Sequence, residues 1–179
     1  SFSLGDGYMD PHSVLQGFLR KAKHLGVQYI DQEVVEILRR GNRLLGVKTK
    51  DGTTYFSSTI VNTAGPYASE VGRMAAVEIP VVPVRRIVYI FKPPRLFEYD
   101  LPLVIDTSGA YFLHETGRQI LTGKSRLEEP SGFNFTWDHH YFNEVIWPLI
   151  AHRIPLFNEL KLVGGWAGLY EVNQWDYNG

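Results

Sequence analysis

The stretch Thr59-Ile60-Val61-Asn62-Thr63-Ala64-Gly65-Pro66-Tyr67 predicts a β-strand that runs through a turn of small residues into a helix. β-Branched residues favour the strand, and Pro66 suits the first turn of a helix over residues 67–76. Ala64 and Gly65 have almost no side chain, so their backbone can approach a ligand, and the N–H groups at the helix start can face an anionic group. The alternative is an ordinary tight connection.

Upstream of this stretch, apolar residues recur at the helical period over residues 11–25 and predict an amphipathic helix. Asp10 is the expected N-cap, Pro11 fits the first turn, and Gly26 ends the helix. Short β-type runs follow and predict a small meander with hairpin turns at Gly41-Asn42 and Asp51-Gly52. These runs are residues 27–30, 34–38, 44–48 and 55–56.

Downstream, the pattern becomes that of an antiparallel sheet with packed helices. Asp138 is the expected N-cap of a helix that Pro148 kinks or restarts and Pro155 ends. The predicted strands are residues 84–91, 103–106, 110–114, 119–122 and 160–172. The fold class is therefore α+β, with a domain boundary near residues 76–83. We divide the chain into parts 1–78, 79–163 and 164–179.

Composition limits the function classes. The formal net charge of −1 comes from 18 basic and 19 acidic residues without long blocks, which argues against a nucleic-acid or anionic membrane surface. The absence of cysteine excludes a disulfide framework, a thiolate nucleophile and a flavin linked through cysteine in this chain. No apolar run is long enough to span a membrane, and residues 1–10 lack the features of a signal peptide.

Several blocks, taken in their order and spacing, resemble the D-amino-acid oxidase superfamily of FAD-dependent oxidoreductases. The resemblance spans nearly the whole chain. The earlier blocks are Gly7-Tyr8-Met9-Asp10-Pro11, residues 26–30, residues 34–37, Asp51-Gly52 and residues 60–67. The later blocks are Pro83-Val84-Arg85-Arg86, Tyr111-Phe112, residues 121–124, and Trp166-Ala167-Gly168-Leu169-Tyr170 with Asp176.

Within the superfamily, residues 106–112 and 166–170 most resemble a mitochondrial branch implicated in the assembly of respiratory complex I, itself similar to sarcosine and dimethylglycine dehydrogenases. The resemblance implies that residues 1–78 are the C-terminal part of an FAD-binding domain without its nucleotide fingerprint and that residues 79–163 are a substrate-binding domain. Residues 164–179 would return toward the FAD domain. It implies FAD as cofactor, a small amine or amino acid as substrate, and oxidation at a CH–NH group. A mitochondrial location is implied, with the cytoplasm as the alternative. The alternative hypothesis is that the protein is a non-catalytic assembly or interaction factor for complex I.

The resemblance also assigns roles to residues. Ala64, Gly65 and Trp166 would lie beside the FAD, and the backbone of Val35 would reach the adenine. Tyr111 would face the substrate as the catalytic tyrosine. Without the resemblance, Val35 is simply a valine of a core strand, and a pair such as Tyr111-Phe112 more often serves strand packing.

A pair of arginines opens the predicted substrate domain. Arg85 or Arg86 could bind a substrate carboxylate, for which a guanidinium group is geometrically suited. Alternation along a strand lets only one of them face a given side, and we assign Arg86 to the substrate. The alternative is a solvated charge on the sheet edge.

The chain departs from the superfamily pattern in two ways. Ser125, preceded by Lys124, stands where the sarcosine oxidase branch has a histidine, which casts doubt on sarcosine-type turnover. His114 could substitute only by facing the side of Tyr111, and strand alternation argues against that. The G-x-G-x-x-G fingerprint that seats the FAD pyrophosphate does not occur in the sequence, so we expect the isolated chain to bind FAD weakly or not at all.

The remaining motifs do not have the spacing of a known metal or phosphate site. His139-His140 and His152 lack the spacing of a metal site, since adjacent histidines on a helix diverge by about 100°. We expect no metal. Residues 164–168 have the wrong glycine spacing for a phosphate loop and should form a strand.

Overall fold

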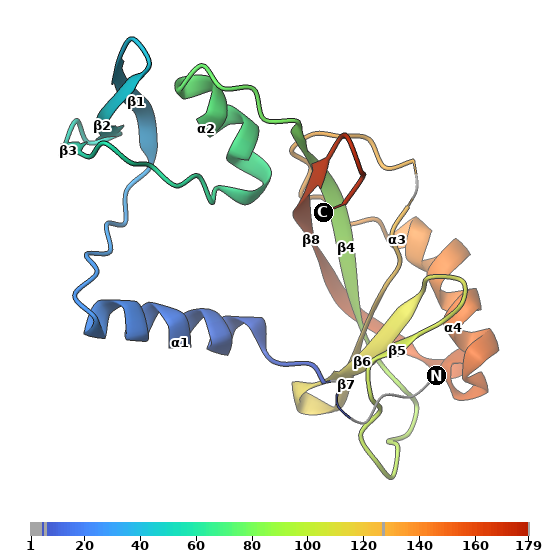
Figure 1. Ribbon diagram of the computed structural model, residues 1–179. Helices are drawn as coiled ribbons and strands as arrows, with labels where there is room; N and C mark the ends of the chain where they lie inside the picture. The colour runs from blue at the N-terminus through green and yellow to red at the C-terminus, as the bar shows by residue number, and fades with distance from the viewer. Residues whose placement is uncertain (1–4, 6, 127, 179) are drawn as a thin grey trace. The chain divides into compact units, whose positions relative to one another are not determined.

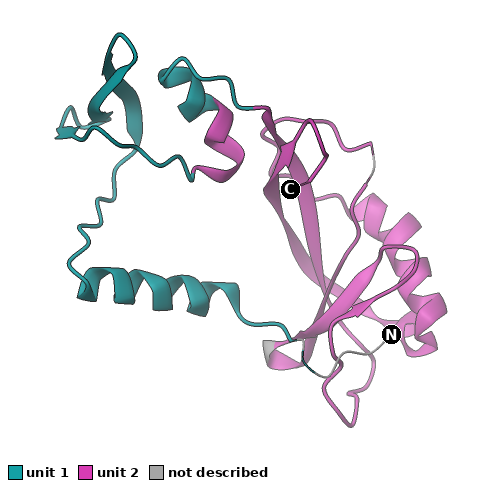
Figure 2. Ribbon diagram, in the orientation of Figure 1, with its two compact units in different colours: residues 1–63, 70–79 teal, residues 64–69, 80–179 magenta. Residues whose placement is uncertain are grey.

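The computed structural model describes residues 5, 7–126 and 128–178. The chain divides into two compact units, coloured separately in Figure 2. The first comprises the chain up to Thr63 together with Glu70–Ile79, and the second comprises Ala64–Ser69 and the chain from Pro80 onward. Figure 1 gives the labels of the helices and strands in chain order.

In the first unit, helix α1 (Pro11–His24) forms as the sequence predicts. The Asp10 carboxylate accepts a hydrogen bond from the backbone N–H of Ser13 at 2.7 Å, and Gly26 takes a positive φ of 87° after the helix end. The apolar face of α1 is nevertheless not buried within this chain, since Leu15 is 62% and Phe18 is 74% exposed.

The predicted meander is confirmed as a three-stranded antiparallel sheet. Its strands are β1 (Val34–Arg40), β2 (Arg43–Thr49) and β3 (Thr54–Phe56). Gly41 in the first hairpin turn and Gly52 in the second both have positive φ, a conformation that favours glycine.

Two predicted strands are wrong. Among the described residues, 27–30 and 59–63 belong to no sheet. β-Branched residues favour a strand, but a strand also needs a neighbouring strand to pair with, and neither segment is part of a described ladder.

The predicted turn into a helix is confirmed at Ala64. The 3₁₀ turn η1 (Gly65–Tyr67) leads directly into α2 (Ala68–Met74). Gly65 has a φ of +52°, in the left-handed region that only glycine enters at little cost.

The second unit contains a five-stranded antiparallel sheet in the order β5-β6-β7-β4-β8. A short loop with Gly117 at positive φ joins β6 to β7, as predicted, through the 3₁₀ turn η2 (Thr116–Arg118). The strands are β4 (Val81–Lys92), β5 (Val104–Ile105), β6 (Tyr111–Glu115), β7 (Gln119–Gly123) and β8 (Lys161–Asn173).

The helices of this unit follow the predicted cap and proline positions. The Asp138 carboxylate accepts from the backbone N–H groups of His140 and Tyr141, and a π-helical stretch precedes Pro148, where the missing N–H interrupts regular pairing. The segments are α3 (His139–Tyr141), the π-helical η3 (Phe142–Ile146), α4 (Trp147–Arg153) and the 3₁₀ helix η4 (Pro155–Glu159).

The main core lies between these helices and one face of the five-stranded sheet (Figure 1). Tyr89 and Phe91 of β4 are fully buried against Phe142 and Phe157. The α+β class with antiparallel sheets is thus confirmed. The assignment to FAD and substrate domains and the division into parts 1–78, 79–163 and 164–179 stay predictions. No helix among the described residues is long and apolar enough to cross a membrane.

Candidate functional site

A row of residues crosses the second face of the five-stranded sheet. Directly opposed residues of antiparallel strands project to the same face. Tyr111 of β6 opposes Gly123 of β7, and Val88 of β4 opposes Trp166 of β8. Because Tyr89 opposes Thr122, its neighbour Val88 stands beside Gly123. Tyr111, Gly123, Val88 and Trp166 therefore share one face, which we call the open face.

The open face is the side of the sheet away from the helices. The neighbouring row on the other face, Phe112, Thr122 and Tyr89, is at most 1% exposed and packs into the core with the helices. On the open face, by contrast, Trp166 is 46% and Tyr170 is 49% exposed. The sheet therefore presents an accessible aromatic surface on a rigid, well-packed support.

Tyr111 lies across Gly123. A Cβ atom at Gly123 would stand 2.7 Å from the Tyr111 hydroxyl oxygen and 2.9 Å from the carbonyl oxygen of Ile87, so the ring occupies the space that a side chain would need. Burial, with a smaller contribution from Tyr170, raises the pKa of Tyr111 above its usual 10.0. The phenol thus stays protonated at neutral pH and can donate a hydrogen bond.

The two arginines of β4 have different surroundings. Arg85 is 10% exposed in its side chain and donates from Nε to Glu129 at 2.7 Å and from Nη1 to the Thr136 carbonyl at 2.7 Å. Arg86 opposes Gly168 and lies on the open face by alternation from Val88. Its guanidinium carbon is 5.1 Å from the ring centre of Tyr170. Of the pair, Arg86 is the one placed beside Tyr170 on the open face.

Ala64 and Gly65 belong to the same unit as Tyr111, since η1 packs against β4 and β8. A Cβ at Gly65 would have one neighbour within 4 Å, a carboxylate oxygen of Glu171 at 3.9 Å. The backbone at Gly65 is therefore open to close approach. The role of Ala64 and Gly65 beside the FAD stays a prediction.

Val35 lies in the first unit, on β1, and is 43% exposed. The register between β1 and β2 shifts between Val34 and Glu36, which makes Val35 the bulged residue. A bulge leaves the backbone of the extra residue outside the ladder and free to bond elsewhere. Its proposed role through the main chain is compatible with this geometry.

The remaining sequence candidates lie apart from the open face. His114 accepts a hydrogen bond from the backbone N–H of Leu101 at 2.6 Å and contacts Phe97 on the core side, so it does not replace the histidine absent at Ser125. Residues 164–168 form part of strand β8, as predicted. Within the described part of the chain no group of three or more potential ligands is placed to hold a metal ion.

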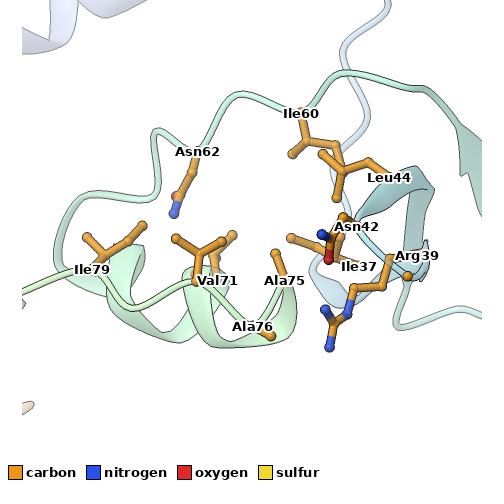
Figure 3. Close-up of a pocket in the computed structure, with 13 residues that line it drawn as sticks. Ile37, Arg39, Asn42, Leu44, Ile60, Asn62, Val71, Ala75, Ala76 and Ile79 are labelled. Carbon is orange, nitrogen blue, oxygen red and sulfur yellow. The ribbon is translucent and has the colours of Figure 1, made fainter.

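Two features of the structure do not follow from sequence patterns. Gly123 and Tyr170 complete the open face, but their neighbours become apparent only from strand register. In the first unit, a pocket of about 440 Å³ lies between the meander and α2, with Ile37, Leu44, Val71 and Ile79 among its lining residues (Figure 3). Segments far apart in sequence form it, and periodicity within one segment cannot reveal such a pocket.

Comparison with known proteins places this geometry in a family. The family model described as FAD dependent oxidoreductase (DAO) matches residues 1–178. The chain is 34% identical over 209 aligned residues to FAD-dependent oxidoreductase domain-containing protein 1 of Xenopus laevis, covering 97% of this chain and 41% of the relative. It is 27% identical to the mitochondrial dimethylglycine dehydrogenase of Rattus norvegicus, covering 78% of this chain and 17% of the relative.

A solved structure, L-proline dehydrogenase from P.horikoshii, superposes with a TM-score of 0.82 at 25% identity, covering 92% of this chain and 44% of that one. Nearly the whole chain aligns with the Xenopus laevis relative, but it spans only about two fifths of that relative's length. The family match over almost every residue and the shared fold agree with the resemblance found in the sequence. The chain belongs to the DAO family of FAD-dependent oxidoreductases.

Proposed function

We propose that this chain forms the substrate-facing wall of an FAD-dependent oxidoreductase that oxidises the C–N bond of a small amine or amino acid. The observation that carries the proposal is the row of Tyr111, Gly123, Val88 and Trp166 on the open face, with Arg86 beside it. The family supplies the reaction class, and related solved structures such as L-proline dehydrogenase support a substrate of this kind.

Tyr111 is the residue that we propose to contact the substrate directly. Its phenol is held by packing over Gly123 and stays protonated, so it can donate a hydrogen bond to a substrate oxygen while its ring excludes water. A rigid aromatic donor of this kind orients a small substrate at little entropic cost.

Arg86 is the proposed anchor for a substrate carboxylate. Arg85 is occupied by Glu129, whereas no carboxylate pairs with Arg86 among the described residues. A guanidinium that stacks on Tyr170 and lacks an ion-pair partner can bind a carboxylate through two parallel hydrogen bonds. This favours amino acids over simple amines as substrates.

Trp166, Ala64, Gly65 and Val35 are the proposed cofactor contacts. The indole of Trp166 offers a half-exposed flat surface, the Gly65 backbone is open to close approach, and the bulge at Val35 frees backbone groups. The indole of Trp166 suits a planar ring, and the accessible backbone at Gly65 and Val35 suits a polar group of the ligand. These residues would hold FAD, which would supply a hydride acceptor for the oxidation of the substrate C–N bond to an imine.

We further propose that the 179-residue chain alone binds FAD weakly, because its sequence contains no G-x-G-x-x-G turn for the pyrophosphate. Equilibrium titration of the chain with FAD tests this directly. A micromolar or tighter complex with yellow absorbance contradicts it.

The test of the function is anaerobic mixing of the FAD-loaded protein, made from its complete coding sequence, with sarcosine, dimethylglycine, L-proline and D-amino acids. Loss of the yellow flavin absorbance with at least one of them is the expected result. Arg86→Gln should raise KM for the reactive amino acid about 100-fold, since it removes a charge-assisted pair. Tyr177→Phe, at a residue 82% exposed, is the matched control and should change nothing.

A second candidate function is an assembly or interaction factor for respiratory complex I. The observation that favours it is Ser125, which supplies no imidazole where the resemblance implies a catalytic histidine. The related dimethylglycine dehydrogenase is a mitochondrial protein, and we propose the same location here, with the cytoplasm as the alternative. Co-purification with complex I subunits from mitochondria, together with no flavin reduction by any amine, would favour this function.

A further inference from the structure

A small cavity lies where the five-stranded sheet loses a strand pairing. Strand β7 pairs with β4 only at Tyr89–Phe91, and the chain returns to β4 through an isolated bridge between Val84 and Ser131. Between these points no described residue pairs with the β7 side of β4. A cavity of about 10 Å³ lies there, with room for about one water molecule.

Two arginines that line this cavity each have a buried donor without an acceptor among the described residues. The Nε atoms of Arg86 and Arg126 are the buried side-chain nitrogens that meet no hydrogen-bond partner among the described residues, and both arginines line the cavity. A buried charged donor without an acceptor destabilises the fold more than an unsatisfied neutral donor does. Two such donors at one cavity indicate a shared acceptor.

The remaining atoms of both arginines are fixed by other contacts. Arg126 donates from Nη2 to Asp138 at 2.6 Å, and its guanidinium carbon is 3.7 Å from the ring centre of Tyr141. Arg86 donates from Nη1 to the Arg85 carbonyl and stacks on Tyr170. Neither Nε can turn toward another acceptor without losing these contacts.

The charge balance favours an anion over a neutral water. The lining holds four basic residues, Arg85, Arg86, Lys124 and Arg126, against one carboxylate, Glu129. Glu129 is paired with Arg85, Asp138 is paired with Arg126, and Lys124 donates to the Ser108 carbonyl. Arg86 is the arginine of this group that no carboxylate balances.

The size of the cavity restricts the ligand further. A carboxylate, phosphate or sulfate needs several times the room of one water molecule, whereas a chloride ion is only slightly larger than water. We propose that this cavity is a binding site for a single halide ion, chloride in the cell, held by the Nε–H groups of Arg86 and Arg126. The ion fixes the Arg86 guanidinium against the end of β7.

The proposal does not involve the flavin, but it shares Arg86 with the proposed substrate site, so the halide is detected without an activity measurement. Crystals of the protein, made from its complete coding sequence, are soaked in sodium bromide and the anomalous scattering of bromide is measured. We expect a bromide peak within hydrogen-bonding distance of both Nε atoms. Density for water, or no density, with no bromide signal overturns the proposal.

Thermal unfolding in solution is the second test of the proposal. The melting temperature should be roughly 2–4 °C higher in sodium chloride or bromide than in sodium gluconate of equal ionic strength. Arg86→Lys keeps the charge but removes Nε–H, and it should abolish the difference. Arg126→Lys is the second variant should Arg86→Lys fail to fold. Arg95→Lys, at an exposed arginine of the same unit, is the control and should retain the full shift.

The two measurements must agree. A bromide peak in crystals without a halide-specific shift in solution marks an adventitious ion only and overturns the proposal. A shift that survives in both Arg86→Lys and Arg126→Lys also overturns it, since the stabilising ion then binds elsewhere.

Discussion

The hydroxyl of Tyr111 lies where a side chain at Gly123 would have to be, 2.7 Å from the position of the missing Cβ atom. The two residues oppose each other on β6 and β7, so the absence of a side chain on one strand sets the conformation of the ring on the next. Gly123 is therefore a positioning residue for the open face, and a substitution there should affect Tyr111 first.

Gly123→Ala should displace the Tyr111 ring and lower kcat/KM by about 10–100-fold, since small misplacements of a substrate-orienting group are costly. The carbonyl of Ile87, at 2.9 Å, leaves the new methyl group no alternative space, so a modest loss of stability should accompany it. Steady-state kinetics and thermal unfolding measure the two effects.

Gly164→Ala is the matched control for that variant. Gly164 lies on β8 of the same sheet, but a Cβ there would have no neighbour within 4 Å. It should leave kcat/KM unchanged. Equal kinetic losses in both variants would show that the loss comes from the sheet in general and not from Tyr111.

Glu129→Gln should lower the free energy of unfolding by roughly 3–5 kcal/mol, because it leaves the charge of Arg85 buried without its partner. The side chains of this pair are 10% and 5% exposed. Urea unfolding followed by tryptophan fluorescence gives the value. Glu33→Gln breaks the exposed pair between Lys50 and Glu33 and should have no measurable effect.

Asp138→Asn should lower the free energy of unfolding at neutral pH, by an amount that disappears in acid. The hydrogen bond from Arg126, more than any other contact, holds the pKa of Asp138 below its usual 3.8. A carboxyl group with a lowered folded-state pKa stabilises the fold above its unfolded pKa, and this stability is lost as the pH falls through the folded value. Asparagine keeps the helix cap but cannot pair with Arg126.

The melting temperature of Asp138→Asn should therefore lie below that of the unmodified protein at pH 7, and the gap should close as the pH falls below about 3.8. Glu129 and Tyr141 also face Arg126, so the variant is compared with the unmodified protein at every pH. A gap that stays constant down to pH 2 would exclude the ion pair as its cause.

Gly65→Ala should weaken FAD binding in the protein made from its complete coding sequence. Alanine at a φ of +52° costs about 1 kcal/mol or more, and the backbone shift that relieves it moves the proposed cofactor turn. Gly26→Ala places the same strain at the end of α1, where φ is +87°. It should lower stability without changing FAD affinity, as measured by titration of the apoprotein.

Much of the fold could be predicted because its signals are local. Asp10 and Pro11 set the start of α1, Gly26 follows its end, and Asp138 sets the start of α3. The prediction of strands at residues 27–30 and 59–63 is wrong because β propensity is local, whereas the pairing of strands depends on the tertiary structure.

The candidate site was less accessible to sequence reasoning. Strand alternation correctly separates Arg85 from Arg86 and His114 from Tyr111. It cannot show that Tyr111 and Trp166 share a row, because that depends on the register of β6, β7, β4 and β8 together. The network of Arg85, Arg126, Glu129 and Asp138 lies partly in a polar loop, where no periodicity indicates which charges meet.

We propose that the open face of the five-stranded sheet forms the wall of the flavin and substrate site. A crystal structure of the protein with FAD and an unreactive carboxylate analogue of an amino acid tests it most directly. We predict the flavin ring against the row of Tyr111 and Trp166, and the carboxylate within hydrogen-bonding distance of Arg86. A flavin and analogue bound elsewhere, with the open face covered by other protein, would contradict the account.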